Sequence, residues 1–196
     1  MKKIFVMMSA ILLFSTSIFA MPVFLDDFNN ENNGSTALNY VGFSQWTVDQ
    51  GSVDLVGGNQ YTNLALDGMS VDLDGSTRNA GRMTSIQFNV MNGQKYTFSF
   101  DIAGNQRGGN DDTFDVLVSF SNYSETFTLA PNVAWSTITR EVTASGNTAQ
   151  IVFNHSGGDN VGALLDNVSL VVPEPSSLLL FGAGILGLGM YRRMKK

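Results

Sequence analysis

The stretch Tyr96-Thr97-Phe98-Ser99-Phe100-Asp101-Ile102 decides the fold class of this chain. Large apolar side chains occupy every second position, and small or polar side chains occupy the positions between them. Successive side chains of a β-strand point to opposite faces of the sheet. The alternation therefore predicts a strand that buries one face in a core and leaves the other face in contact with water.

The same alternation recurs along the middle of the chain. Further strands are predicted near residues 116–120, 126–129, 150–154 and 168–172, and two runs rich in Thr and β-branched residues span 82–90 and 135–143. The segments between these runs are rich in Gly, Asn, Asp and Ser, which favour turns. This spacing predicts an all-β fold, an antiparallel β-sandwich with almost no helix between residues 21 and 172.

The first 20 residues predict a secretory signal peptide. Lys2 and Lys3 form a charged start, residues 4–19 form an apolar run, and Ala20 is the small residue before the expected cut. An uncleaved N-terminal anchor is the alternative, because Ile18 is larger than the residue usual at that position. The chain has no cysteine, so disulfides and thiol chemistry are excluded despite the predicted export.

The last 24 residues carry three features in a fixed order: Pro173-Glu174-Pro175, an uncharged run over 178–191, and a basic end over 192–196. The prolines favour an extended backbone. The 14-residue run predicts a helix of about 21 Å, which is short for a membrane core of about 30 Å. We expect a transmembrane helix whose basic end lies in the cytoplasm, and a buried helix of the domain is the alternative.

This order of features closely resembles the PEP-CTERM sorting signal over residues 172–196. The resemblance implies that Pro173, Glu174 and Pro175 form the recognised tripeptide, and that Arg192 and Arg193 form the stop. It implies a partner, the membrane cysteine transpeptidase exosortase, which is thought to process such proteins during export. It also implies a Gram-negative bacterium, transient residence in its inner membrane, and delivery to the cell surface or matrix.

The segment between the two ends has the length of one domain and a strongly acidic composition. Residues 21–172 hold five basic and 16 acidic side chains, a net charge of −11. Such a surface repels nucleic acid and anionic lipid, and it suits divalent cations or neutral sugars. We expect three parts: a signal peptide over 1–20, a β-sandwich domain over 21–172 and a sorting signal over 173–196.

The order of elements in this domain also resembles a galactose-binding-like jelly roll, the fold of many carbohydrate-binding modules. The resembling segments are residues 24–28, 44–48, 51–55, 70–75, 96–105 and 163–170. The resemblance implies a fold and a binding role, and it does not specify a ligand.

Asp166 is the carboxylate that most strongly indicates a metal-binding site. By alternation it shares a face with Leu164, Val168 and Leu170, where a charge is costly unless it is paired or coordinated. In jelly rolls of this type a structural Ca²⁺ commonly joins the N-terminal acidic segment to an aspartate of the last strand. The resemblance assigns Asp27 and Asp166 to that ion. A carboxylate held by backbone N–H groups is the alternative.

Two polar loops and two further side chains are the candidates for sugar binding. The loops span residues 75–82 and 104–112, and their Asn, Arg and Asp side chains can bond sugar hydroxyls. The predicted ligand-binding residues are Tyr61, Arg78, Asn105, Arg107, Asn110 and His155. Ordinary solvated turns are the alternative. Trp46 and Trp135 are predicted in the core, because each opens an alternating run.

Catalysis has the least support in the sequence. His155 is the only histidine, and no Gly-x-Ser-x-Gly elbow occurs. Asp72 and Asp74 could form the carboxylate pair of a glycosidase, but they also fit a strand that runs into a turn at Gly75. We therefore expect a non-catalytic, exported protein that binds extracellular polysaccharide. A purely structural component of the surface or biofilm matrix is the alternative, followed by an exported hydrolase.

Overall fold

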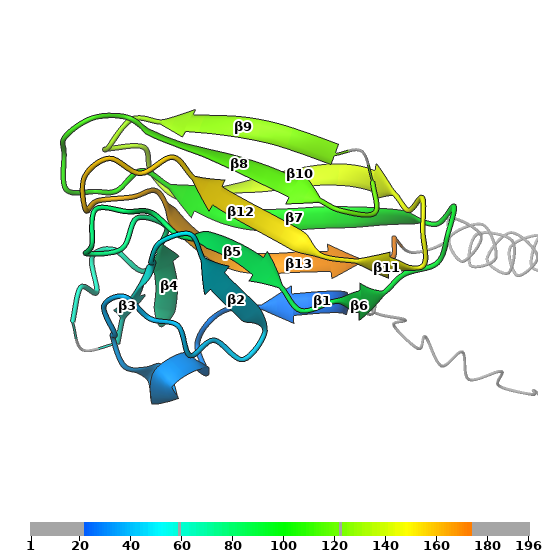
Figure 1. The fold of residues 1–196 in the computed structure, drawn as a ribbon, viewed down its shortest axis with the longest axis horizontal. Helices are drawn as coiled ribbons and strands as arrows, with labels where there is room; N and C mark the ends of the chain where they lie inside the picture. Colours follow the sequence, from blue (N-terminus) through cyan, green and yellow to red (C-terminus); the bar gives the residue numbers. More distant parts are fainter. Residues whose placement is uncertain (1–21, 59, 122, 174–196) are drawn as a thin grey trace, which may run out of the picture. The chain divides into compact units, whose positions relative to one another are not determined.

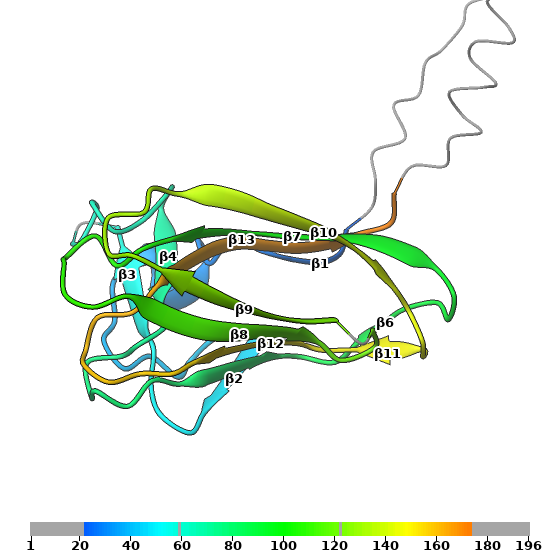
Figure 2. The ribbon, with the colours of Figure 1, turned by 90° about the horizontal axis from the view of Figure 1, so that it is seen from above.

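Two antiparallel sheets pack face to face around an aromatic core (Figures 1 and 2). The computed structural model describes residues 22–58, 60–121 and 123–173. The predicted signal peptide and the predicted membrane helix lie outside the described residues. Within the described ranges, no helix is long and apolar enough to span a membrane. The predicted all-β sandwich is confirmed.

The first sheet has the strand order β10-β7-β13-β4-β3, with β1 also paired to β13. Its strands are β1 (Pro22–Asp26), β3 (Asp54–Gly57), β4 (Met69–Asp72), β7 (Lys95–Ala103), β10 (Ser136–Thr143) and β13 (Leu164–Val171). The second sheet has the order β2-β5-β12-β8-β9. Its strands are β2 (Trp46–Asp49), β5 (Arg82–Ser85), β8 (Asp112–Val118), β9 (Tyr123–Leu129) and β12 (Ile151–His155). A small pair, β6 (Phe88–Asn89) with β11 (Thr148–Ala149), and the 3-10 turn η1 (Glu31–Gly34) complete the described elements.

The core forms where the alternating faces of the two sheets meet. On β7, the four apolar side chains of residues 96, 98, 100 and 102 are buried, as predicted. Phe100 makes edge-to-face contacts with Phe127 of β9 and Phe153 of β12, at ring-centroid distances of 5.6 and 5.4 Å. Such aromatic contacts bury large apolar areas, so they hold the two sheets together across the core.

A buried polar bond joins the first strand to the second sheet. The ring nitrogen Nε1 of Trp46 donates to Asp26 Oδ2 at 2.8 Å, and Phe28 N donates to Asp26 Oδ1 at 2.9 Å. Trp46 is buried in the core, as predicted. The prediction for Trp135 is correct only in part, because its ring is half-buried against a separate small cluster.

A β-bulge in β13 changes the face on which Asp166 lies. The pairing with β7 shifts register between Asp166 and Ser169, and Asn167 adopts φ 48°. Leu165, Val168 and Leu170 therefore face the main core, whereas Leu164 belongs to the separate small cluster. The expectation that Asp166 shares the face of Val168 and Leu170 is wrong, because the bulge inserts one residue into the alternation. Asp166 is nevertheless buried, at 1% exposure.

Two further expectations are corrected by strand boundaries. The run 82–90 is two strands, because the chain leaves the second sheet at Ile86, which is 49% exposed. The strand predicted near residues 150–154 placed His155 in the loop that follows it. His155 is instead the last residue of β12, paired with Phe114 of β8, and its side chain is buried.

The chain enters and leaves the sandwich at the same end. Pro22 of β1 pairs with Val171 of β13. The eight residues of β13 place its start at Leu164 about 25 Å away, at about 3.3 Å per residue. Figure 1 shows the loops before β8 and β13 gathered at that far end.

Candidate functional site

Three loops enclose a pocket at the end of the sandwich that lies far from Pro22 and Val171. They follow β4 (residues 73–81), β7 (104–111) and β12 (156–163). The pocket has a volume of about 270 Å³. Its lining residues are Asp74, Asn110, Asp111, Asp112, Thr113, His155, Ser156, Gly157, Gly158 and Asp159.

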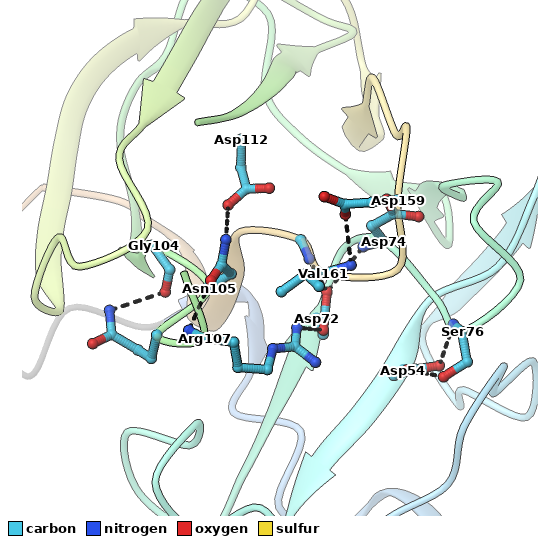
Figure 3. A network of polar contacts seen from close by, with 12 residues as sticks. Asp54, Asp72, Asp74, Ser76, Gly104, Asn105, Arg107, Asp112, Asp159 and Val161 are labelled. Atoms are coloured by element: carbon cyan, nitrogen blue, oxygen red, sulfur yellow. Dashed lines mark hydrogen bonds and ion pairs between the residues drawn. The ribbon is translucent and has the colours of Figure 1, made fainter. Parts of the chain in front are cut away.

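The buried carboxylate of Asp72 joins the three loops beneath this pocket (Figure 3). Its Oδ2 accepts from the guanidinium of Arg107, in the loop after β7. Its Oδ1 accepts from the backbone N–H of Gly162, in the loop after β12, at 2.8 Å, and from Asp74 N at 3.1 Å. Burial raises the pKa of Asp72 to about 7, although the Arg107 charge acts in the opposite direction.

Gly162 is required by this close approach. A Cβ atom at residue 162 would lie 2.3 Å from the backbone nitrogen of Asp74 and 2.7 Å from Asp72 Oδ1. No side chain fits at those distances, so the loop after β12 reaches Asp72 only because residue 162 has no side chain.

Asn105 shapes the loop between β7 and β8. Its Nδ2 donates to Asp112 Oδ2 at 2.9 Å, and its Oδ1 accepts from Arg107 N at 2.8 Å. The side-chain amide of Gln106 donates to the backbone oxygens of Gly104 and Val133. These bonds fix the loop, so Asp112 is held at the pocket in one orientation.

Two buried polar side chains face the pocket without a partner in the described part of the chain. Asp74 is 1% exposed, and neither of its carboxylate oxygens accepts a hydrogen bond. Burial raises the pKa of Asp74, although His155 and the nearby backbone N–H of Asp159 act in the opposite direction. His155 Nδ1 accepts from Gly157 N at 3.0 Å, so the neutral ring carries its proton on Nε2. That Nε2 has no hydrogen bond and lies 3.7 Å from Asp112 Oδ1.

The lining is strongly negative. It contains the four carboxylates of Asp74, Asp111, Asp112 and Asp159, and no Lys or Arg is among the described lining residues. The pocket therefore offers many hydrogen-bond acceptors, and its side-chain donors include His155 Nε2–H, the Asn110 amide and the Ser156 hydroxyl. Such a lining suits hydroxyl groups or a cation and repels an anion.

The structure brings together some of the sequence-predicted ligand residues. Asn110 and His155 line the pocket, and Asn105 and Arg107 lie beneath it. Tyr61 and Arg78 are exposed but do not line it.

The four lining carboxylates were not among the predicted ligand residues. Asp74 was considered only as half of a hydrolase pair with Asp72. Asp111 and Asp112 lie where the loop after β7 meets β8. Asp159 ends a Gly-Gly-Asp sequence in the loop after β12. Nothing in the sequence indicates that these segments meet.

The predicted calcium residues lie in a second acidic site. Asp166 Oδ2 accepts from Ser70 Oγ at 2.9 Å, and its Oδ1 accepts from Asn167 N at 2.7 Å. Burial, together with the charges of Asp101 and Asp27, raises the pKa of Asp166 to about 7, although its two hydrogen bonds act in the opposite direction. A cation would relieve this repulsion, so the residues fit the predicted ion.

Carboxylates alone would not hold an ion at this second site. Among the described residues, no three His, Asp or Glu side chains converge closely enough for that. Calcium prefers six to eight oxygen ligands. The remaining ligands of a calcium bound here would be backbone carbonyls and water.

Comparison with known proteins gives two matches that together cover most of the chain. The profile of a family described as protein of unknown function (DUF642) matches residues 24–171. The profile of the PEP-CTERM protein-sorting motif matches residues 171–195, so the predicted sorting motif is confirmed. No curated protein matches the sequence.

Two solved structures resemble the fold at low identity. TmCBM61 in complex with β-1,4-galactotriose is 14% identical, with 67% of this chain and 90% of that chain covered and a TM-score of 0.50. The K3 cleaved adhesin domain of Lys-gingipain from Porphyromonas gingivalis w83 is 13% identical, with 78% and 98% covered and a TM-score of 0.50. At these identities the likeness shows a shared fold.

The chain also matches part of a larger enzyme. The exo-β-1,3-galactanase from Phanerochaete chrysosporium is 19% identical, with a TM-score of 0.42, and 69% of this chain is covered. The chain spans only 29% of that enzyme's length.

The first prediction concerns the ion pair beneath the pocket. Arg107→Gln should lower the free energy of unfolding by about 2 kcal/mol at about pH 8, because the ionised Asp72 loses its charged partner. At about pH 5 the loss should be well under half as large, because the folded-state pKa of Asp72 is about 7 and the carboxyl is then protonated. Urea unfolding at both pH values, followed by tryptophan fluorescence, measures the difference.

Arg82→Gln is the matched control. Arg82 pairs with Asp49 at 2.8 Å, but both side chains are more than a third exposed. That variant should lose less than about 1 kcal/mol at either pH, because exposed ion pairs contribute little. An equal loss for Arg107→Gln at both pH values would contradict the burial argument.

We propose that Asp27 and Asp166 hold a structural Ca²⁺. Calcium at about 100 times its Kd should then raise the melting temperature by about 5–10 °C at about pH 8, since it binds only the folded state. Asp166→Asn should abolish the rise, whereas Asp67→Asn, which changes an exposed carboxylate, should keep it. A melting temperature that is the same in EDTA and in calcium would rule out the ion.

Proposed function

Because the chain belongs to the family described as protein of unknown function (DUF642) and carries a PEP-CTERM sorting motif, we propose that it is an exported, surface-sorted protein that binds extracellular polysaccharide in the loop-end pocket. The proposal has two parts, the binding site and the sorting route, and each has its own test.

The observation that carries the binding site is the pair of buried, unpartnered groups, Asp74 and His155 Nε2. Leaving buried polar groups unpaired costs free energy. Neighbouring hydroxyls of a sugar could donate to the two oxygens of Asp74 and accept from His155 Nε2–H. A sugar would therefore satisfy both groups at once.

The size and fold of the site support a sugar ligand. A volume of about 270 Å³ lies just below the range of about 300–1,000 Å³ for drug-sized ligands, which suits one or two sugar units. The fold is that of TmCBM61, whose structure contains β-1,4-galactotriose. That likeness supports the proposal through the fold alone.

A binding role is favoured over hydrolysis by the state of Asp72. A glycosidase needs two free carboxyl groups, one as acid and one as base or nucleophile. Asp72 is already engaged by Arg107 and by two backbone N–H groups, so it cannot serve as the second carboxylate for Asp74. This removes the Asp72–Asp74 pair considered from the sequence, and we propose that the pocket binds a sugar without hydrolysing it.

The sorting route rests on the motif at residues 171–195. We propose that an exosortase recognises Pro173, Glu174 and Pro175 while the segment 178–191 holds the chain in the inner membrane. The domain leaves its sheet at Val171, next to this tripeptide, and the pocket lies at the far end of β13.

The third prediction tests the pocket. The full chain, in a detergent without a sugar headgroup, should bind one or more immobilised polysaccharides on a glycan array. His155→Ala should weaken that binding about tenfold or more, because one good hydrogen bond in a buried site corresponds to about a factor of ten.

Tyr61→Ala serves as the comparison, since Tyr61 is exposed and lies outside the pocket. It should bind as the wild type does. Binding lost in Tyr61→Ala and kept in His155→Ala would move the site away from the pocket. Absence of binding to every glycan would favour the structural role instead.

The fourth prediction tests the sorting route. Glu174→Ala should leave full-length protein in the membrane fraction of the native host, because the recognised tripeptide loses its only charge. Immunoblots of membrane and medium fractions give the readout, and Glu141→Ala, an exposed residue of the domain, is the control. Wild-type processing of Glu174→Ala would contradict the assignment of the tripeptide.

A further inference from the structure

The charge of the pocket restricts the kind of sugar that it can take. Its four carboxylates come from three separate loops and the first residue of β8, and the described lining holds no Lys or Arg to neutralise them. Asp74, the most deeply buried of them, has no hydrogen-bond donor on either oxygen. A neutral sugar can satisfy these oxygens with hydroxyls but leaves the negative charge uncompensated.

We infer that the pocket selects an amino sugar whose amine is free and protonated, such as a glucosamine unit of a de-N-acetylated polysaccharide. This inference rests on the proposed function, because it names the ligand class of the same pocket. The ammonium group supplies up to three N–H donors and one positive charge. Two of its donors can bind the oxygens of Asp74, and its single positive charge offsets part of the negative charge of the lining.

The other polar group of the pocket fits the same ligand. In a 2-amino sugar, the carbons on both sides of the amine carry oxygen atoms. One of these can accept from His155 Nε2–H, while a hydroxyl can donate to Asp112 Oδ1, which lies 3.7 Å from that nitrogen. The buried donor and the buried acceptor would then be satisfied by adjacent positions of one ring.

A divalent cation fits this pocket less well than an ammonium group does. Calcium needs several oxygen ligands within about 2.3–2.6 Å of a single point. Among the described residues, no three carboxylate or histidine side chains converge in that way. An ammonium group on a sugar ring accepts a looser arrangement, because its N–H bonds point outward to acceptors at about 2.7–2.9 Å.

N-acetylation would remove the features that the pocket recognises. It replaces the ammonium by an amide, which has one N–H donor, no charge and an added carbonyl acceptor. That carbonyl would face carboxylates that offer it no donor. A uronic acid would fare worse, because its own carboxylate would be repelled by the four in the lining.

The test is a calorimetric titration of the full chain, in a detergent without a sugar headgroup, at about pH 5.5 and about 0.15 M salt, about two units below the pKa of an ordinary α-amino group. The three probes are the tetramers of glucosamine, N-acetylglucosamine and glucose. The glucosamine tetramer should bind at least about tenfold more tightly than either other probe.

Two variants separate the pocket from general charge attraction. Asp74→Asn keeps the shape of the side chain and removes its charge, so the preference for glucosamine should fall to about threefold or less. Asp115→Asn removes one carboxylate from β8 outside the pocket and should keep the wild-type preference. Melting curves of both variants show whether they fold, and neither substitution breaks the Asp72 network.

The outcomes distinguish a failure of the amino-sugar inference from a failure of the proposed sugar-binding function. Equal binding of all three tetramers overturns the amino-sugar inference and leaves the pocket as a general sugar site. No binding of any tetramer, together with no binding on the array, overturns both. A glucosamine preference that falls equally in Asp74→Asn and Asp115→Asn reflects the net charge of the domain, and it also overturns the inference.

Discussion

The burial of Asp72 is the constraint on which the functional end of this molecule depends. One carboxylate at the end of β4 binds a guanidinium from the loop after β7 and a backbone N–H from the loop after β12. These loops are far apart in sequence. Removing a charge from water is expensive, so Asp72 is tolerated only while all of its partners are in place. The same requirement fixes the loops that form the pocket.

The two acidic sites differ in what the protein does with a buried carboxylate. Asp72 is neutralised by a guanidinium and bridges three segments, so its burial stabilises the arrangement of the loops. Asp166 receives two hydrogen bonds and faces other carboxylates, which is why a cation was proposed there. Asp74 receives no hydrogen bond on its side chain from the described residues. From Asp72 through Asp166 to Asp74, the protein itself therefore supplies fewer and weaker partners for the buried carboxylate.

The sequence predicted the framework well because a half-buried strand leaves a local signal. The alternation of residues 96–102 identified β7 and its inward face, and similar runs identified β8 and β12. The sheet face predicted for Asp166 was wrong because a bulge at Asn167 shifts the alternation by one residue, and a bulge is specified by long-range pairing. His155 was misplaced for the same kind of reason, because its pairing with Phe114 extends β12. The pocket could not be predicted from the sequence, because the convergence of three loops leaves no periodic pattern.

The contrast between Asp72 and Asp74 is the strongest argument that this end of the sandwich has a ligand. A domain that needed only stability could carry an uncharged residue at position 74, because that side chain makes no bond within the described structure and its burial raises the free energy of the ionised form. Gly162 lets the loop after β12 reach Asp72, and Asn105 and Arg107 fix the loop after β7, but none of these contacts supplies a donor to the Asp74 carboxylate. The framework thus holds an uncompensated acceptor at the base of an open, negatively charged pocket. Such an arrangement lowers the stability of the free domain and gains free energy only when an external donor enters, which is the physical signature of a binding site.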